Sequence, residues 1–540
     1  MNRIGKTVDF ISKSKGVVKF IYLVLSALIF ALPFICEKLW FCAWLGLSLL
    51  FVVVFDNNKP LKRVFGSLFC FFFAFYVFAY SWFVSLFPLD FAGLSDIESM
   101  GVILVAETLI PLIHSCLMVP FVFLGVVCAR NVKNNYLRAC LVSFGYVLGE
   151  FAQSLGPLAF PWAMLFVGQS ERIEILQSAS IFGSRFITFI IVFVNVLIAK
   201  SFLNVKSNRR KSKRYVCAAL AVFMLNFGFG IVRVGTADFS DEKTLTAAAF
   251  QGNISSVEKW SETSLPATMI YEELAEKLRD ECETNGKKID VAVLPETAFA
   301  SSVNPANPTG ASYRTSSEIA QKLYCSLFVG AFRNDEEKSY NSIFVFDENG
   351  VCSDEAYDKV NLVPFGEFLP YRQLFTALTP FLTEINMLSD DLTKGKAEYP
   401  LKSRVGKGVS LVCFDSIFPE NSRIQAKNGA DFIVVSTNDS WYKESAALRQ
   451  HASHSVMRAI ENGLPVIRSA NTGISLICDP VGRILSRSGV NERTYVVADI
   501  PINRNTTVYT AVGDILVPLS FVVLLSVLIY CFVKNKILPH

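Results

Sequence analysis

The sequence predicts a bundle of membrane-spanning helices joined to one soluble α/β domain, and three observations support this fold class. Hydrophobic residues make up 52% of the 540 residues and charged residues only 18%, which is more apolar than a typical soluble protein. About eight apolar runs approach the roughly 20 residues that a helix needs to cross a bilayer. Between the last two runs, from Thr236 to Thr510, short strand-like runs alternate with helical patterns, as in α/β domains.

The predicted spans follow one another closely in the first part of the chain. The fifth is the weakest, because it contains Glu150 and Gln153. In order, the spans are Val17 to Phe34, Leu39 to Phe55, Val64 to Phe87, Val102 to Cys128, Ala139 to Leu155, Ile181 to Ala199, Tyr215 to Val232 and Val512 to Val533. The sequence therefore predicts a membrane domain over residues 1–235 with about seven helices, an outer domain over 236–510, and a last helix with a cytoplasmic tail over 511–540.

Basic residues indicate the orientation of these spans. Lysine and arginine cluster near the N-terminus and after the second, fourth, sixth and last spans. With eight spans, all of these tracts fall on one side, which the positive-inside rule assigns to the cytoplasm. We therefore expect both termini in the cytoplasm and residues 236–510 on the opposite side. The first span could also be a signal peptide, but no small-x-small cleavage pattern follows it, which favours an uncleaved anchor.

One basic tract, Lys206 to Arg214, could alternatively bind nucleic acid. The net charge of the whole chain is only +4, and the tract lies in a short loop between two spans. Both facts favour a topology signal, so no nucleic-acid partner is expected.

The outer domain reads as strands and helices in alternation. The expected strands are Leu245 to Phe250, Val291 to Leu294, Leu327 to Phe332, Ser342 to Phe346, Val409 to Phe414, Phe432 to Ser436 and Ile474 to Cys478. The expected helices are Thr268 to Glu283, Ser316 to Tyr324, Glu420 to Asn428 and Ala446 to Asn462. This alternation is typical of an α/β sheet.

Three reactive side chains lie at or near the ends of apolar strand-like runs. Glu296 and Cys413 each end such a run, and Lys359 follows Tyr357 and Asp358. Taken singly, each has an ordinary explanation: a solvated acid, a surface lysine and a core thiol. Together they offer a base, a cation and a nucleophile, because a thiol needs a base or a neighbouring cation to react.

Other candidate sites are weaker. His451 and His454 are spaced to share one face of a helix, but no obvious co-ligands accompany them, so a polar helix face near the domain surface is the better explanation than a metal site. The thirteen cysteines include no CxxC, which argues against a zinc site and a full disulfide framework. Glu107, His114 and Glu150 could line an ion path in a transporter, but these acids are few and unpaired in the sequence.

The longer motifs around the three reactive residues resemble those of the nitrilase superfamily. They are Pro295-Glu296-Thr297-Ala298, then Asp358-Lys359 with Leu362-Val363-Pro364-Phe365-Gly366-Glu367, then Val412-Cys413-Phe414-Asp415. With the predicted spans, and with strings such as Asn438-Asp439-Ser440-Trp441-Tyr442, the chain is similar to the apolipoprotein N-acyltransferases within that superfamily.

This resemblance implies a four-layer αββα sandwich with Glu296 as base, Lys359 as oxyanion stabiliser and Cys413 as nucleophile. It also implies that Glu367 supports the site and matches Trp260 to a tryptophan near the acyl-chain entrance. Two residues depart from the family pattern. Asp415 stands where the acyltransferases usually have glutamate, and Phe414 where tyrosine is common.

The implied reaction is ping-pong transfer of a fatty acyl chain from a membrane phospholipid to the α-amine of a diacylglyceryl-cysteine, through a thioester on Cys413. It needs neither metal nor cofactor. The implied setting is the bacterial inner membrane, with a monomer whose outer domain is periplasmic. A membrane-tethered amidohydrolase is the alternative, with water as acceptor. The apolar tract Pro380 to Leu388 could be a mobile lid or an ordinary packed loop.

Overall fold

The computed structural model describes residues 16–55, 60–89, 94–255, 266–335, 338–373, 391–502 and 506–537. The chain forms two compact units. One comprises the described residues up to Val84, Gly101–Thr236 and those from Val512 onward. The other comprises Ser85–Met100 and Ala237–Ala511. The second unit thus takes in a loop from the first part of the chain.

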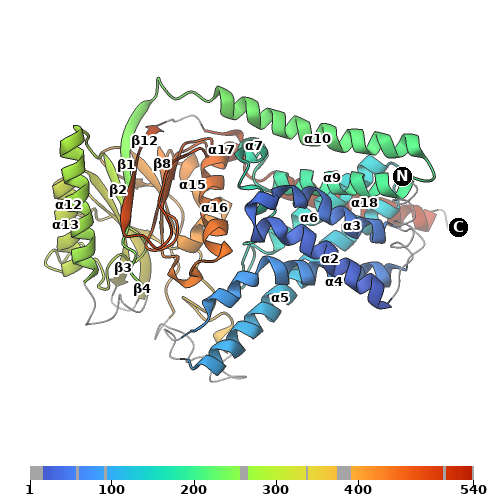
Figure 1. The fold of residues 1–540 in the computed structure, drawn as a ribbon, viewed down its shortest axis with the longest axis horizontal. Helices are drawn as coiled ribbons and strands as arrows, with labels where there is room; N and C mark the ends of the chain where they lie inside the picture. The colour runs from blue at the N-terminus through green and yellow to red at the C-terminus, as the bar shows by residue number, and fades with distance from the viewer. Residues whose placement is uncertain are drawn as a thin grey trace. The chain divides into compact units, whose positions relative to one another are not determined.

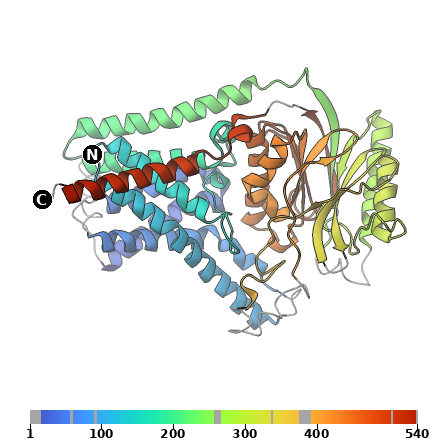
Figure 2. The same ribbon diagram turned by 180° about the vertical axis from the view of Figure 1, so that it is seen from behind.

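The first unit is built from helices (Figures 1 and 2). Among the described residues, seven helices are long and apolar enough to cross a membrane. They are α2 (Gly16–Ile35), η1 with α3 (Glu37–Val54), α4 with η2 (Leu61–Leu86), α5 (Asp96–Arg130), α9 (Arg185–Asn204), α10 (Arg209–Thr236) and α18 (Leu516–Ile537). All seven match predicted spans. The last begins later than expected, because Gly513 leaves the helical conformation with a φ of 83°.

The predicted fifth span folds as helix α6 (Asn135–Ala152), which is less apolar than the other seven. Its Glu150 is buried and accepts a hydrogen bond from the Leu165 N–H at 3.0 Å and another from the Thr188 hydroxyl at 2.7 Å. A buried carboxylate is tolerated where donors replace water, so Glu150 fixes the loop after α6 within the helical unit.

The described residues of the second unit form two six-stranded sheets. The first has the order β12 (Thr494–Ile502), β1 (Lys243–Gln251), β2 (Val291–Val293), β3 (Ser326–Asp335), β4 (Lys338–Phe346) and β5 (Tyr357–Asp358). The second has the order β11 (Ile484–Arg487), β10 (Leu476–Cys478), β9 (Val466–Ala470), β8 (Phe432–Thr437), β7 (Lys407–Val412) and β6 (Leu401–Lys402). Strands β1, β2 and β3 are parallel, as are β7, β8 and β9.

Side-chain alternation along the strands explains why the sheets stack. On β1, Ala247 and Ala249 face the core between the sheets, where they join Val434 and Ile467 of the second sheet. Ala248 and its neighbour Phe250 point the other way, into a second core. Because both faces of the sheet are buried, its strands are apolar at nearly every position rather than at every other one.

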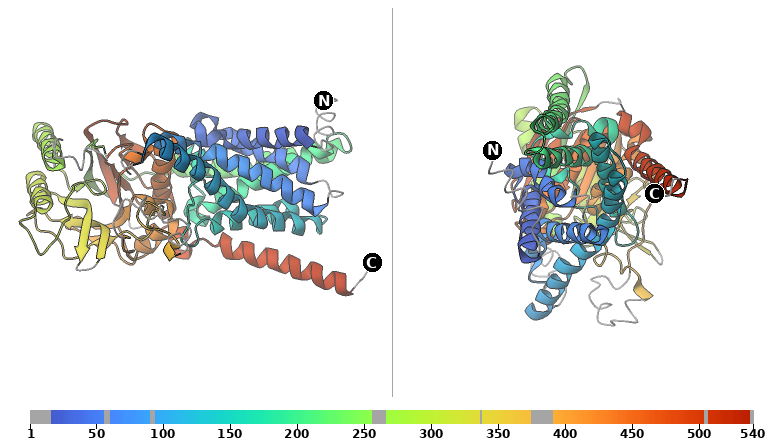
Figure 3. Two further views of the ribbon diagram at one scale, coloured as in Figure 1. Left: turned by 90° about the horizontal axis from the view of Figure 1, so that it is seen from below. Right: turned by 90° about the vertical axis from the view of Figure 1, so that its right-hand side faces the viewer.

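Helices cover the outer faces of both sheets. Helices α12 (Ala267–Asn285) and α13 (Ala311–Leu323) supply the second core on the first sheet. Helices α15 (Pro419–Lys427) and α16 (Ala446–Asn462) lie beside the second sheet (Figures 1 and 3). The Gln425 amide of α15 donates to the Ser410 carbonyl and accepts from its N–H. The order α–β–β–α confirms the predicted sandwich.

Five of the described strands were not among the expected ones: the short strands β5, β6 and β11, and the longer strands β9 and β12. Strand β9 carries Arg468 and Ser469, both buried, and such polar residues hide the apolar pattern of a central strand. Strand β12 lies at the sheet edge and is only partly buried. Conversely, strand β7 ends at Val412, two residues earlier than predicted, because Cys413 turns the chain out of the extended conformation.

Candidate active site

The candidate residues lie beyond the carboxyl ends of parallel strands. Glu296 follows β2, Cys413 directly follows β7, and Asn438 directly follows β8. In parallel sheets the carboxyl ends open together onto one crevice, which is where ligands bind in many α/β proteins. The Asn438 N–H donates to Oε2 of Glu296 at 2.9 Å, so this site draws on both sheets.

Cys413 occupies a strained backbone position. Its φ is +48°, a region that non-glycine residues rarely adopt, and the 3-10 turn η6 (Cys413–Ile417) begins there. The side chain is buried, with 7% of the residue exposed. Burial raises the pKa of the Cys413 thiol and the Glu296 carboxylate raises it further, whereas the Lys359 ammonium lowers it only in part. The resting thiol is therefore protonated, and it needs a base in order to react.

Glu296, Lys359 and Glu367 form one buried charged cluster. The Lys359 ammonium donates to Oε1 of Glu296 at 3.1 Å and to Oε1 of Glu367 at 2.8 Å. The Val363 N–H donates to the other oxygen of Glu367 at 2.8 Å, which fixes that side chain. The structure thus brings Glu296 together with Lys359 and Glu367, which lie more than 60 residues further along the chain.

The two carboxylates keep Lys359 charged. Lys359 is only 1% exposed, and burial lowers the pKa of its ammonium. Glu296 and Glu367 outweigh burial and hold that pKa well above its ordinary value. A fixed ammonium in a water-poor site can stabilise an oxyanion more strongly than one in bulk water.

Asn341 is a member of this cluster that the sequence interpretation missed. From β4, its side-chain amide donates to Oε1 of Glu296 at 2.7 Å and to Oε1 of Glu367 at 3.1 Å. Lys359 binds the same two oxygens, and its backbone N–H donates to the Asn341 carbonyl at 2.8 Å. In the sequence, a single asparagine within a strand does not by itself indicate a functional residue. Only the pairing of β4 with β5 brings it opposite Lys359.

Asp415 joins the turn of Cys413 to the segment after Lys359. It is fully buried, and its carboxylate accepts hydrogen bonds from the Asn361 N–H at 2.7 Å and the Tyr357 hydroxyl at 2.9 Å. Burial raises the pKa of Asp415 to about 6, although Lys359 and the hydrogen bonds that it accepts lower it in part. Although aspartate is one methylene shorter than glutamate, Asp415 therefore still links the turn of Cys413 to the segment after Lys359.

Of the remaining predicted residues, Phe414 is among those that the structure describes. Phe414 is buried and its ring packs edge-on against Phe418 at 5.4 Å between centroids. Trp260 and the tract Pro380 to Leu388 lie outside the described residues.

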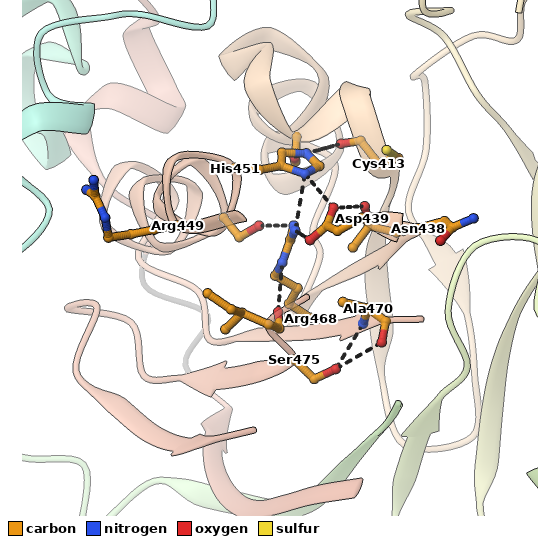
Figure 4. A network of polar contacts seen from close by, with 12 residues as sticks. Cys413, Asn438, Asp439, Arg449, His451, Arg468, Ala470 and Ser475 are labelled. Atoms are coloured by element: carbon orange, nitrogen blue, oxygen red, sulfur yellow. Dashed lines mark hydrogen bonds and ion pairs between the residues drawn. The ribbon is translucent and has the colours of Figure 1, made fainter. Parts of the chain in front are cut away.

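The expectation that His451 and His454 form a polar face near the domain surface was wrong. Both are fully buried on α16, a helix whose residues are almost all buried. His451 lies beside Cys413 and contacts Asp439 and Arg468 (Figure 4). Among the described residues, no group of three or more His, Cys, Asp or Glu side chains is placed to hold a metal ion.

Comparison with known proteins places the chain in a family. Residues 246–509 match the carbon-nitrogen hydrolase family, and residues 26–197 match the apolipoprotein N-acyltransferase N-terminal domain. The apolipoprotein N-acyltransferase of Geobacter metallireducens is 31% identical over 379 residues, which cover 68% of this chain and 69% of that protein. The chain belongs to the apolipoprotein N-acyltransferase family. The Rickettsia typhi member is 30% identical over 74% of this acyltransferase and 78% of its own length, and the Bradyrhizobium diazoefficiens member is 29% identical over 76% of each.

The family and the helices together establish two points. The protein is an acyltransferase with a nitrilase-superfamily domain. The seven apolar helices found among its described residues make it a multi-pass membrane protein.

Proposed function

We propose that this acyltransferase moves a fatty acyl chain from a membrane phospholipid to the α-amine of the N-terminal diacylglyceryl-cysteine of an apolipoprotein. The carrier is Cys413, which forms a thioester between two half-reactions. The observation that carries the proposal is the buried Glu296–Lys359–Glu367 cluster beyond the ends of the strands, beside a thiol on a strained turn.

In the first half-reaction, Glu296 takes the proton of the Cys413 thiol, and the thiolate attacks the carbonyl carbon of the phospholipid ester. Negative charge collects on the former carbonyl oxygen, where the Lys359 ammonium and a backbone N–H stabilise it. The ester C–O bond then breaks. The departing lysophospholipid oxygen takes the proton from Glu296, which leaves the acyl group on sulfur.

In the second half-reaction the lipoprotein amine attacks the thioester carbon. Glu296 accepts a proton from the amine nitrogen, and the same donors stabilise the second oxyanion. The C–S bond breaks and the sulfur recovers a proton from Glu296. The enzyme returns to its starting state without a metal or a nucleotide.

The membrane helices support a lipid donor. Each CH₂ group moved from an apolar environment into water costs about 0.8 kcal/mol, so an acyl chain is moved most cheaply within a bilayer. We propose that residues 236–510 form the catalytic domain on the periplasmic face of the inner membrane. Residues 1–235 and 511–540 would anchor it, with both termini in the cytoplasm, and the protein would act as a monomer. Reporter fusions at each terminus and sizing in detergent test these points.

Mass spectrometry of the intact protein after incubation with phospholipid tests the carrier. We expect a fatty-acyl adduct on the wild type and none on Cys413→Ala. Cys478→Ala is the matched control, because Cys478 is also a buried cysteine of the same unit. An adduct that persists in Cys413→Ala, or full N-acylation by that variant, overturns the proposal.

The amidohydrolase alternative predicts a different product. A hydrolase releases free fatty acid, whereas an acyltransferase yields an N-acylated peptide when a diacylglyceryl-cysteine peptide is supplied. Measuring both products in one reaction separates the two activities.

A further inference from the structure

A buried polar cluster lies behind the turn of Cys413 and outside the Glu296–Lys359–Glu367 cluster. It consists of Asp439, two residues beyond β8, His451 on α16 and Arg468 on β9 (Figure 4). All three side chains are fully buried. Burying a charge costs several kcal/mol per ion even after the protein relaxes, and pairing only offsets this cost, so such a cluster is weak evidence for a stabilising role alone.

The cluster holds the backbone carbonyl of Cys413. His451 places Nε2 at 3.2 Å from that carbonyl oxygen, and the Ser416 hydroxyl donates to the same oxygen at 2.7 Å. A carbonyl has two lone pairs, so both donors can bind it at once. Together they fix the orientation of the peptide between Cys413 and Phe414.

The contacts of His451 hold its ring in place from both sides. Its Nε2 lies 3.2 Å from both the Cys413 carbonyl oxygen and the Ser416 hydroxyl, and because the carbonyl only accepts, a hydrogen bond to it requires a proton on Nε2. Its Nδ1 lies 2.8 Å from Oδ1 of Asp439 and 3.2 Å from the Arg468 guanidinium. The Arg468 guanidinium donates to the other oxygen of that carboxylate at 2.7 Å. Burial acts to raise the pKa of Asp439, but Arg468 and His451 outweigh it and hold this pKa below its ordinary value.

The held peptide has a direct bearing on the nucleophile. A non-glycine residue at a φ of +48° is strained by roughly 1–3 kcal/mol, so the surroundings must hold the turn in place. The backbone of Cys413 sets the direction of its Cα–Cβ bond and hence of the thiol. Because the peptide group is planar and trans, fixing the Cys413 carbonyl also fixes the Phe414 N–H, which points the opposite way. The N–H after a nucleophile on such a turn is a common oxyanion donor.

We infer that His451, held by Asp439 and Arg468, is a positioning residue that clamps the Cys413–Phe414 peptide and so aims both the thiol and the following N–H at the reacting carbonyl. This inference rests on the proposed thioester mechanism. His451 does not touch substrate. It acts only through the backbone of Cys413, as does Ser416.

Two variants of His451 separate positioning from packing. In His451→Gln the longer amide can still donate to the Cys413 carbonyl, whereas in His451→Asn the shorter amide reaches only Asp439. We expect His451→Asn to slow formation of the acyl adduct about 10- to 100-fold, with KM for phospholipid changed by less than about twofold. We expect His451→Gln to stay within about fivefold of the wild type.

Comparing His451→Asn with His451→Gln shows which results would contradict the inference. Equal rate losses in His451→Asn and His451→Gln would mean that the ring only fills space, and unchanged rates in both would mean that the carbonyl needs no clamp. Either result overturns the inference. His454→Gln is the matched control, since His454 is equally buried one turn along α16, and we expect it to lower the melting temperature without changing the rate.

Ser416→Ala keeps the inference testable if the histidine variants fold poorly. It removes the second donor to the same carbonyl without altering any charge, and we expect a rate loss of about tenfold. Unchanged adduct formation in Ser416→Ala would overturn the inference. If the proposed thioester mechanism itself were wrong, the wild type would form no acyl adduct on Cys413. That result can be distinguished from a failure of the positioning inference alone.

Discussion

Replacing Asp415 with asparagine changes hydrogen bonding and charge at one point without changing volume. The Oδ1 atom of Asp415 accepts from the Asn361 N–H at 2.7 Å and from the Asn421 amide at 3.2 Å. Its Oδ2 atom accepts from the Tyr357 hydroxyl at 2.9 Å and from the Val412 N–H at 3.4 Å. An asparagine has only one acceptor oxygen, so in either orientation its NH₂ group faces donors.

The effects on stability nearly cancel. Leaving two buried donors without acceptors costs about 1–3 kcal/mol each. Against this, burial raises the pKa of Asp415 from 3.8 to about 6, which corresponds to about 3 kcal/mol of destabilisation of the ionised folded state. The uncharged asparagine side chain avoids this destabilisation. We therefore expect a small change in melting temperature at neutral pH, but about a 100-fold fall in kcat, because Asp415 no longer holds the segment after Lys359 against the turn of Cys413.

The pH dependence gives an independent check. Between about pH 4 and pH 6 the folded wild type holds more protons at Asp415 than the unfolded chain does, so its stability falls as pH rises through this window. The variant lacks the titrating group. The stability of the wild type relative to Asp415→Asn should therefore decrease by about 2 kcal/mol from about pH 4 to about pH 7.

Two measurements test this reasoning: N-acylation kinetics, and thermal unfolding in detergent at several pH values. A variant with wild-type kcat, or a stability difference that does not change with pH, would refute it. Asp415→Glu restores the usual family residue and keeps the charge. We expect it to retain more activity than Asp415→Asn, although one extra methylene in a closed site costs about 1–3 kcal/mol.

Three further changes have defined outcomes. Gly330→Ala places a Cβ against the Pro295 carbonyl oxygen and 2.8 Å from the Glu296 Cα, so it should cost about 1–3 kcal/mol in thermal unfolding and lower kcat at least about tenfold. Asn341→Asp keeps the shape but sets a third carboxylate against Glu296 and Glu367, and we expect kcat to fall about 100-fold; an active variant would show that the amide bonds are dispensable. Glu367→Gln removes one of the two acids that raise the pKa of Lys359, so the alkaline limb of the pH–rate profile should move to lower pH, and an unmoved limb would contradict this.

Functional residues at the ends of strands are easier to predict from the sequence than functional residues inside strands or helices. Glu296 and Cys413 stand at sharp changes from apolar to polar, and such changes survive in a single sequence. Asn341 and Arg468 lie inside strands, where one polar residue reads as solvent-facing. Their importance depends on strand order and on the stacking of two sheets, which periodicity does not encode. His451 was wrongly expected near the surface for the same reason. In the sequence, a helix face that is polar because it faces water has the same pattern as one that belongs to a buried hydrogen-bond network.

The burial of Cys413 also has a consequence for oxidation. Oxidants attack the thiolate of an accessible cysteine first, through sulfenic acid. Cys413 is 7% exposed and its thiol pKa is raised, so the resting enzyme presents almost no thiolate to peroxide. On the proposed periplasmic face, where disulfides form readily, this protects a carrier that must stay reduced. In the proposed mechanism, the thiol is thus shielded from oxidative damage until Glu296 takes its proton.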